Sequence, residues 1–227
     1  MLAKKYKSEI VSINNLFEDI YTLEFKSLGR KFKFQPGQFL HLAIDDEYDG
    51  IGQWPESRCF SMQSNPHDET LKITYAVKGN FTKEMKQYLK VGAKVWLKLP
   101  YGDLFSQPHS LKNTIFIAGG TGITPFLSLF THPSFNEYEN PRIYLGFRSP
   151  KYNIYESELS QIINNNAIVY KRYQDKSGVL DIKQIVEENG IENSYFISGP
   201  PEMIKLFKQS LINKGVNPNN VLTDDWE

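Results

Sequence analysis

The stretch Ile115-Phe116-Ile117-Ala118-Gly119-Gly120-Thr121-Gly122-Ile123-Thr124-Pro125 places an apolar strand directly before a glycine-rich turn. Glycines let a backbone approach a ligand with no Cβ in the way, and Pro125 suits the first turn of a helix, where no N–H partner is needed. A helix start presents free amides and the positive end of its dipole to anions. The stretch therefore predicts a phosphate-binding turn, although glycine also marks ordinary strand-to-helix connections.

Downstream of this stretch, strands alternate with helices. Such alternation is typical of a parallel sheet, whose ligands lie beyond the carboxyl ends of the strands. Residues 119–124 and 199–201 both follow strands, so two loops are predicted to face one crevice. We expect strands at 114–118, 142–147, 168–173 and 194–198, and helices at 125–130, 155–164, 182–188 and 202–215, the last with Met203, Leu206, Phe207 and Leu211 on its apolar face.

The preceding half of the chain reads as short strands at intervals of about ten residues with turn residues between them, which predicts an antiparallel β-barrel. A helix at 82–89 interrupts this rhythm. Residues 45–55 are acidic and have no periodicity, which indicates a solvated loop or an entrance for a partner. The expected strands are 8–14, 20–27, 38–44, 58–63, 71–77 and 94–99. We therefore expect a barrel domain, 1–108, and an α/β domain, 109–227, with a polar linker at 107–112.

Composition excludes several classes of protein. Acidic and basic residues balance at 26 each among 227 residues, so no overall basic field draws the chain to nucleic acid or an anionic membrane. Cys59 is the only cysteine and the four histidines lie at no ligand spacing, so we expect no disulfide, iron–sulfur cluster or other metal site. The sequence has no run of about 18 apolar residues and no signal-like start, and we expect a cytoplasmic protein.

Two segments of the β-rich half carry residue types that bind a phosphorylated planar ligand. In Arg58-Cys59-Phe60-Ser61, alternation along a strand sends Arg58 and Phe60 to one face, where a guanidinium can bind phosphate and a ring can stack on a heterocycle. In Gly79-Asn80-Phe81-Thr82, helix amides and the Thr82 hydroxyl can bind a second anionic group. The alternatives are an exposed Arg beside a core Phe, and an ordinary helix cap at Thr82.

Six segments, in order along nearly the whole chain, resemble motifs of the ferredoxin–NADP reductase family of flavin-dependent oxidoreductases. In that family a β-barrel holds FAD and an α/β domain holds a nicotinamide dinucleotide. The segments are Phe34-Gln35-Pro36-Gly37-Gln38-Phe39, Arg58-Cys59-Phe60-Ser61 (similar to Arg-x-Tyr-Ser), Gly79-Asn80-Phe81-Thr82 (Gly-x-x-Ser/Thr), Leu99-Pro100-Tyr101-Gly102-Asp103-Leu104-Phe105 (Pro-x-Gly-x-Phe), residues 119–125 (the nicotinamide pyrophosphate loop) and Ser198-Gly199-Pro200-Pro201 (Cys-Gly-Pro-Pro).

The resemblance implies a role for each matched position. Arg58 would pair with FAD phosphate, Phe60 would stack near the isoalloxazine, and Ser61 would lie close to the flavin N5. Thr82 would hold pyrophosphate, and Gly199 would let the nicotinamide carboxamide approach. The implied catalytic residues are Ser61, Thr121 and Ser198, and the implied cofactor contacts are Arg58, Phe60, Ser61, Val77, Gly79, Phe81, Thr82, Gly120, Thr121, Gly122, Arg148, Arg172, Gly199, Pro200 and Trp226.

Phe60 stands where the family has Tyr, which keeps a stacking surface and removes a hydroxyl. Ser198 stands where the family has Cys, so a harder oxygen replaces a polarizable sulfur and we expect slower hydride transfer. Trp226 could cover the flavin, as a terminal aromatic does in some relatives, or belong to a loosely ordered tail.

The choice of dinucleotide stays open between NADPH and NADH. Arg172 follows a predicted strand of the second domain, and no acidic residue obviously awaits a ribose 2′-hydroxyl, which favours the 2′-phosphate of NADPH. A basic solvated edge would account for the same residues. The plausible neighbours of the 2′-phosphate are Ser149, Lys151 and Lys171.

The resemblance implies an enzyme that passes hydride from NAD(P)H to FAD and hands electrons to a separate carrier such as ferredoxin or flavodoxin, since one cysteine cannot hold a cluster in this chain. We expect a monomer. One alternative is direct reduction of a small acceptor, such as a ferric chelate or free flavin. Another is a noncatalytic flavin or dinucleotide sensor, for which the changes at Phe60 and Ser198 are the only hints.

Overall fold

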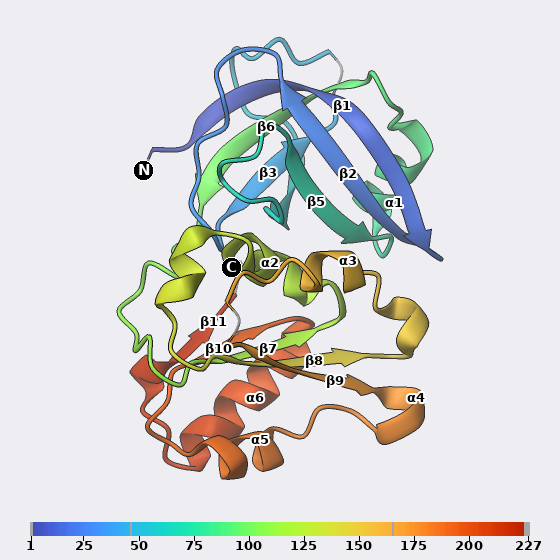
Figure 1. Ribbon diagram of the computed structural model, residues 1–227. Coiled ribbons are helices and arrows are strands. Elements are labelled where there is room, and N and C mark those ends of the chain that lie inside the picture. The colour runs from blue at the N-terminus through green and yellow to red at the C-terminus, as the bar shows by residue number, and fades with distance from the viewer. Residues whose placement is uncertain (1, 46, 165, 225–227) are drawn as a thin grey trace. The chain divides into compact units, whose positions relative to one another are not determined.

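The computed structural model describes residues 2–45, 47–164 and 166–224, and its chain divides into two units, Met1–Asp103 and Leu104–Glu227 (Figure 1). Each unit has its own hydrophobic core. The polar segment 107–112, predicted as a linker, falls in the second unit by this division. The domain boundary itself stays a prediction.

The first unit is a six-stranded antiparallel sheet that curves into a near-barrel, as predicted (Figure 1). The N–H of Gln63, just after one outer strand, donates to the carbonyl of Lys72 in the other at 2.8 Å and ties the two outer strands together. The sheet order is β4-β3-β6-β1-β2-β5, with β1 (Lys4–Phe17), β2 (Ile20–Ser27), β3 (Phe39–Ala43), β4 (Ser57–Ser61), β5 (Leu71–Ala76) and β6 (Lys94–Tyr101).

Strand alternation fills the barrel interior with apolar side chains. Leu23 and Phe25 of β2 and Leu40 and Leu42 of β3 are fully buried there. The helix α1 (Asn80–Tyr88) adds Phe81 and Met85 to the same core, because these residues lie four positions apart on one helix face. β1 is longer than the predicted 8–14, since its first half pairs with β6 and its second half with β2.

The acidic segment before β4 is a loop, but the expectation that it is merely solvated is wrong for its aromatic residues. The ammonium of Lys5 donates to the Tyr48 hydroxyl and, at 3.2 Å, to the Gly50 carbonyl. The indole N–H of Trp96 donates to the Tyr48 carbonyl at 2.8 Å, and an ideal Cβ at Gly50 would lie 2.5 Å from the Trp96 ring. The loop is therefore fastened to the outside of β1 and β6.

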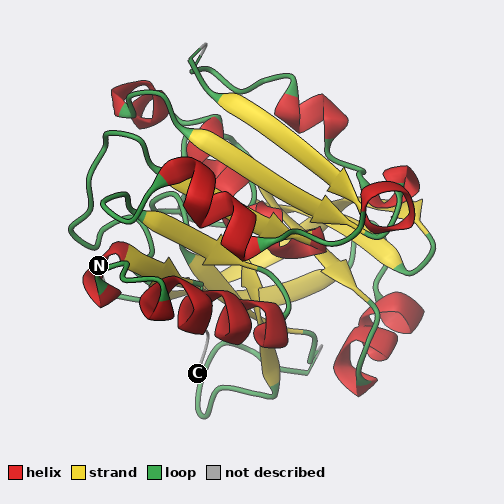
Figure 2. Cartoon of the chain, turned by 90° about the horizontal axis from the view of Figure 1, so that it is seen from below, coloured by secondary structure: helices red, strands yellow, loops and turns green. Residues whose placement is uncertain are grey.

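The second unit is a five-stranded parallel sheet covered by helices on both faces (Figure 2). This matches the α/β prediction. The sheet order is β11-β10-β7-β8-β9, with β7 (Ile115–Gly119), β8 (Arg142–Phe147), β9 (Ile168–Tyr173), β10 (Tyr195–Ser198) and β11 (Val221–Thr223). The short strand β11 is not among the predicted strands.

The central strands β7 and β10 are apolar on both faces, as burial between two layers of helices requires, whereas the edge strand β9 is largely exposed. Phe116 and Phe196 face α2 (Thr124–Phe130) and α3 (Glu156–Leu159), whereas Ile117 and Ile197 face α5 (Ile182–Asn189) and α6 (Pro201–Asn213). The remaining short elements are η1 (Gly120–Ile123), η2 (Pro133–Glu137), η3 (Pro150–Tyr152), α4 (Gln174–Ser177) and η4 (Pro218–Asn220).

Two helix predictions need correction. The predicted helix 155–164 is only four residues long, because the following backbone bonds elsewhere: the Ile163 N–H donates to the Phe130 carbonyl, and the Asn164 side chain donates to the carbonyls of Phe135 and Tyr138. In α6, Leu206 is 61% exposed and Ile204 is buried instead. Phe207 and Leu211 are buried as predicted, and Met203 is partly buried.

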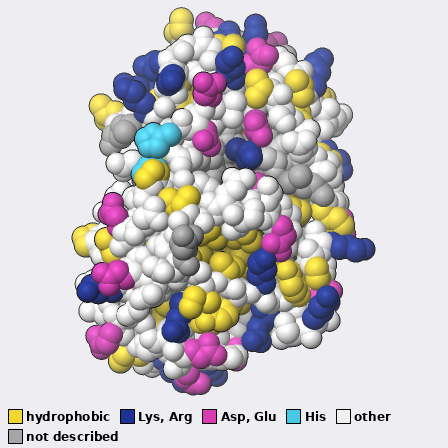
Figure 3. Space-filling view, in the orientation of Figure 1, with side chains coloured by type: hydrophobic (Ala, Val, Ile, Leu, Met, Phe, Trp, Pro, Cys, Tyr) yellow, Lys and Arg dark blue, Asp and Glu magenta, His cyan; other side chains and the backbone are white. Residues whose placement is uncertain are grey.

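Acidic and basic side chains are interspersed over the face seen in Figure 3, in keeping with the balanced charge of the sequence. Among the described residues, no helix combines the length and apolar character needed to cross a membrane. Within the same ranges, no group of three or more His, Cys, Asp or Glu side chains gathers where a metal ion could be held.

Candidate cofactor-binding sites

Arg58 is the first residue of the candidate cofactor site in the first unit. It lies on β4, and its guanidinium carbon is 5.2 Å from the centre of the Phe81 ring, which belongs to the first turn of α1. Its Nη2 donates to the Glu56 Oε1 at 2.8 Å, and its Nη1 donates to the Ser57 carbonyl at 2.8 Å. A forked cation thus lies beside a helix start, an arrangement that can bind a phosphate.

The start of α1 is built by Gly79 and Thr82. Gly79 is the N-cap residue, and the Thr82 hydroxyl accepts from the N–H groups of Lys78 (2.9 Å) and Gly79 (3.1 Å) and donates to the Gly79 carbonyl (3.0 Å). The first N–H groups of a helix have no partner inside it. The Thr82 hydroxyl therefore does serve as part of a helix cap, and this cap orients free amides next to Arg58.

Phe60 and Ser61 follow Arg58 on β4 and are almost fully buried, at 8% and 4% exposure. The Phe60 ring packs edge-on against Tyr75, with 6.1 Å between ring centres, and it belongs to the barrel core. Burial, and the neighbouring Tyr21, raise the pKa of Tyr75, so its phenol stays neutral at physiological pH. Val77, just after β5, packs on the same core, and its N–H donates to the Asp19 carbonyl at 2.9 Å.

In the second unit, the glycines of the turn after β7 have two different surroundings. Gly120 has φ +56, and an ideal Cβ there would meet nothing within 4 Å, so its surroundings are open. Gly119 and Gly122 instead permit packing: a Cβ at Gly119 would lie 2.8 Å from the Met203 sulfur, and one at Gly122 would lie 2.4 Å from the Gly199 Cα. Of the three glycines, Gly120 is the one with open space where a side chain would stand.

The predicted helix after this turn begins with a short 3-10 segment, η1, before α2. The Thr124 hydroxyl donates to the Thr121 carbonyl at 3.0 Å and closes the junction between them. Thr121 itself is half-buried at the carboxyl edge of the sheet. The loop after β10 meets the same edge through Gly199, whose φ is +152. The two predicted loops therefore do come together within this unit.

Ser198 ends β10 and is 2% exposed. Its hydroxyl donates to the Asp224 Oδ2 at 3.1 Å, and the Asp224 N–H donates to the Ile197 carbonyl at 3.0 Å. The next residues, Gly199 and the exposed Pro200, lead into α6, with Pro200 at its N-cap. Asp224 is absent from the predicted site, since it follows a strand that the sequence pattern did not reveal.

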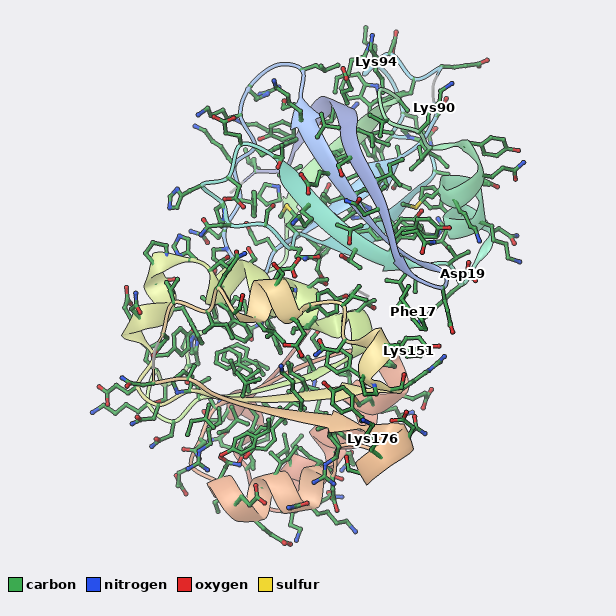
Figure 4. The ribbon with its side chains drawn as sticks, turned by 45° about the vertical axis from the view of Figure 1, so that its right-hand side comes forward. Phe17, Asp19, Lys90, Lys94, Lys151 and Lys176 are labelled. Atoms are coloured by element: carbon green, nitrogen blue, oxygen red, sulfur yellow. The ribbon has the colours of Figure 1, made fainter. Side chains whose placement is uncertain are left out.

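Several basic residues lie at or just after the ends of β8 and β9 in the chain. Arg148 is exposed, with its guanidinium 5.8 Å from the centre of the Tyr152 ring, and its carbonyl accepts from the Asp175 N–H. Arg172 is held by the Ser177 carbonyl (3.2 Å). Figure 4 labels Lys151 and Lys176, which extend from the segments after these two strands.

Lys171 does not join this group. Its ammonium is paired with the Glu156 carboxylate of α3 at 2.6 Å, and strand alternation sends Lys171 and Arg172 to opposite faces of the sheet. Ser149 precedes η3 and stays near Lys151 in the chain. Trp226, the predicted terminal aromatic, lies outside the described residues.

Comparison with known proteins identifies the class. A family model for an FAD-binding domain matches residues 5–145, and one for an oxidoreductase NAD-binding domain matches residues 116–209. The features above fit these cofactors, because each unit presents a site suited to phosphate: Arg58 beside the start of α1, and the open Gly120 turn. The chain belongs to the ferredoxin–NADP reductase-like family of FAD- and NAD(P)H-binding oxidoreductases.

Three relatives illustrate the match. The chain is 26% identical to the sulfhydrogenase 2 gamma subunit of Pyrococcus furiosus, over 96% of this chain and 82% of that one. It is 24% identical to a ferredoxin–NAD(P)+ reductase of Metapseudomonas resinovorans, over 97% and 68%. A ferredoxin NADP+ reductase from Neisseria gonorrhoeae, solved with bound FAD and NADP, superposes with a TM-score of 0.77 at 20% identity, over 93% and 92%.

Other curated relatives are considerably longer than the matched region. Their names describe reductase components of dioxygenase and monooxygenase systems, and the chain spans between 36% and 61% of three of them. The similarity therefore defines the family and its two cofactor-binding domains.

Proposed function

We propose that this chain is an NADPH-dependent flavin reductase that delivers electrons to a separate protein carrier of the ferredoxin or flavodoxin type. The observation that carries the proposal is the presence of a phosphate-suited site in each unit, Arg58 beside α1 in one and the Gly120 turn in the other. A protein that binds only one dinucleotide would need one such site.

Arg58, Gly79 and Thr82 would hold the FAD pyrophosphate, and Phe60 and Ser61 would lie along the flavin. When bound, FAD accepts a two-electron hydride from the nicotinamide and can release its electrons singly. The work of this chain is to orient the two rings, exclude water and shape the environment of the reacting atoms. Thr121, Gly199 and Ser198, at the carboxyl edge of the parallel sheet, would position the nicotinamide.

The Ser198 side chain contributes a fixed polar atom to this edge. The Ser198 hydroxyl donates its proton to the Asp224 carboxylate. The lone pairs of the Ser198 oxygen can therefore still accept hydrogen bonds from other groups. No side chain in this arrangement needs to act as a general acid or base for hydride transfer.

NADPH is favoured over NADH by the charges at the ends of β8 and β9. Arg148, Lys151, Arg172 and Lys176 supply cations there, and Arg172 is already oriented by the Ser177 carbonyl. Guanidinium groups suit the planar, multidentate recognition of a phosphate. The 2′-phosphate of NADPH would add contacts that NADH cannot make.

The delivery of electrons to a carrier is supported by the composition of the chain and by its relatives. Cys59 is the only cysteine and is half-buried beside His41 on β3, so an iron–sulfur cluster bound by cysteines in this chain is excluded. Several relatives are named as reductase components of oxygenase systems or as ferredoxin reductases.

A steady-state assay tests the carrier. We expect NADPH oxidation under anaerobic conditions to need an added ferredoxin or flavodoxin, and to saturate with the carrier at micromolar concentration. Equal turnover with ferric citrate or free flavin at matched concentrations would contradict the proposal and favour a reductase of small acceptors.

A further inference from the structure

Glu56 forms an ion pair with Arg58, the residue whose guanidinium would bind a flavin phosphate in the proposed function. The Glu56 Oε1 accepts from the Arg58 Nη2 at 2.8 Å, and the two side chains are 71% and 53% exposed. Glu56 directly precedes β4, two residues before Arg58, and its ion pair with Arg58 places the two side chains together. This carboxylate therefore occupies one of the donors through which Arg58 could bind an anionic ligand.

The backbone around Glu56 is held in place on its N-terminal side by the fastened loop. The indole N–H of Trp54 donates to the Ser57 hydroxyl at 2.9 Å. Trp54 also packs edge-on against Tyr48, with 5.7 Å between ring centres, and Tyr48 is bonded to Lys5. Glu56 thus sits between two anchored residues and is presented to Arg58 by a fixed backbone.

Arg58 is at the same time within reach of the start of α1. Its guanidinium carbon lies 5.2 Å from the centre of the Phe81 ring, and its Nη1 is retained by the Ser57 carbonyl. Since an exposed ion pair is weak, Arg58 can exchange the carboxylate for a phosphate with little loss. A diphosphate at the helix start would receive both the helix amides and the released guanidinium.

We propose that Glu56 is a built-in competitor for the flavin diphosphate: it holds Arg58 while the site is free of FAD, and FAD must displace it to bind. This inference rests on the assignment of Arg58 to flavin phosphate. Glu56 then lowers the affinity for FAD in two ways, by occupying the guanidinium and by repelling a ligand that carries two negative charges. It thereby makes the bound flavin more readily exchangeable.

The test compares FAD with riboflavin, which lacks phosphate, on the full chain freed of flavin. Dissociation constants are measured from the quenching of flavin fluorescence at low ionic strength. For Glu56→Gln we expect FAD to bind about three- to tenfold more tightly, as the loss of a nearby repulsive charge and a weak ion pair predicts, with no change for riboflavin. Glu47→Gln, which removes an exposed carboxylate from the same loop, is the matched control and should leave both constants unchanged.

Arg58→Ala separates this inference from the assignment beneath it. If Arg58→Ala leaves FAD affinity unchanged, Arg58 does not bind the phosphate and the assignment fails. If Arg58→Ala weakens FAD but Glu56→Gln does not strengthen it, the assignment stands and the competition does not exist. In the Arg58→Ala background, Glu56→Gln should gain less than in the native chain. An equal gain would mean that Glu56 acts only through its distant charge, and would overturn the inference.

Discussion

Gly122 and Gly199 touch each other, since an ideal Cβ built at Gly122 would lie 2.4 Å from the Gly199 Cα. The loops that follow β7 and β10 therefore pack backbone against backbone at the carboxyl edge of the parallel sheet. No flexible side chain lies at this contact to move aside. This packing alone is enough to require glycine at position 122.

Gly122→Ala is accordingly expected to destabilise the second unit by about 1–3 kcal/mol, the usual cost of forcing an extra group into packed structure. Urea unfolding followed by circular dichroism would measure it. Gly29→Ala is the control, because a Cβ at Gly29 meets nothing within 4 Å, and its stability should not change. A Gly122→Ala chain as stable as the native one would show that the two loops separate at no cost.

Thr82→Val should release flavin and weaken the start of α1. The Thr82 hydroxyl accepts from two backbone N–H groups, and losing a cap of this kind costs about 1 kcal/mol. Thr82→Ser keeps the hydroxyl and should retain flavin at nearly the native level. The flavin-to-protein absorbance ratio after gel filtration reports the difference. If both variants retained the same amount of flavin, the hydroxyl would have no part in the site.

Arg172→Ala should raise the Michaelis constant for NADPH much more than that for NADH, because only NADPH carries the phosphate that the guanidinium would bind. Lys171→Ala is the matched control. Lys171 lies next in sequence but is paired with Glu156 on the other face of the sheet, so its loss should affect the two nucleotides alike. Equal effects of Arg172→Ala on NADPH and NADH would remove the reason for preferring NADPH.

Ser198→Cys should speed flavin reduction severalfold while leaving flavin content unchanged. Sulfur is larger and more polarizable than oxygen, and a thiol is a weaker hydrogen-bond donor to Asp224 than the native hydroxyl. Anaerobic stopped-flow absorbance at saturating NADPH measures the rate. An unchanged or slower rate would show that serine at this position does not limit the reaction.

Much of the fold follows from local pattern. The strands that carry Arg58 and Ile117 lie where alternation and apolar runs predicted them, since each packs a face whose periodicity is visible in sequence. The prediction of a helix over residues 155–164 was wrong because Ile163 and Asn164 form hydrogen bonds with residues 130, 135 and 138, which lie far away in the chain. The strand β11 has only three residues, too few for any periodicity.

The candidate site was predicted less completely than the fold. Glycine positions marked both ligand-binding loops, yet the sequence could not tell Gly120, which is open, from Gly122, which is packed. Asp224 and Glu56 were missed because each acts on a predicted residue through a contact between side chains. Glu56 had one available signal, its place two residues before Arg58 in the sequence; Asp224 had none before β11 was known.

The most direct measurement is an anaerobic absorption titration of the purified chain with NADPH and then with NADH, following the visible flavin band. We expect a yellow protein that NADPH bleaches at near-stoichiometric amounts, with NADH needed in excess. A colourless protein, or a bound flavin that neither nucleotide reduces, would contradict the proposed function and indicate a noncatalytic nucleotide-binding protein.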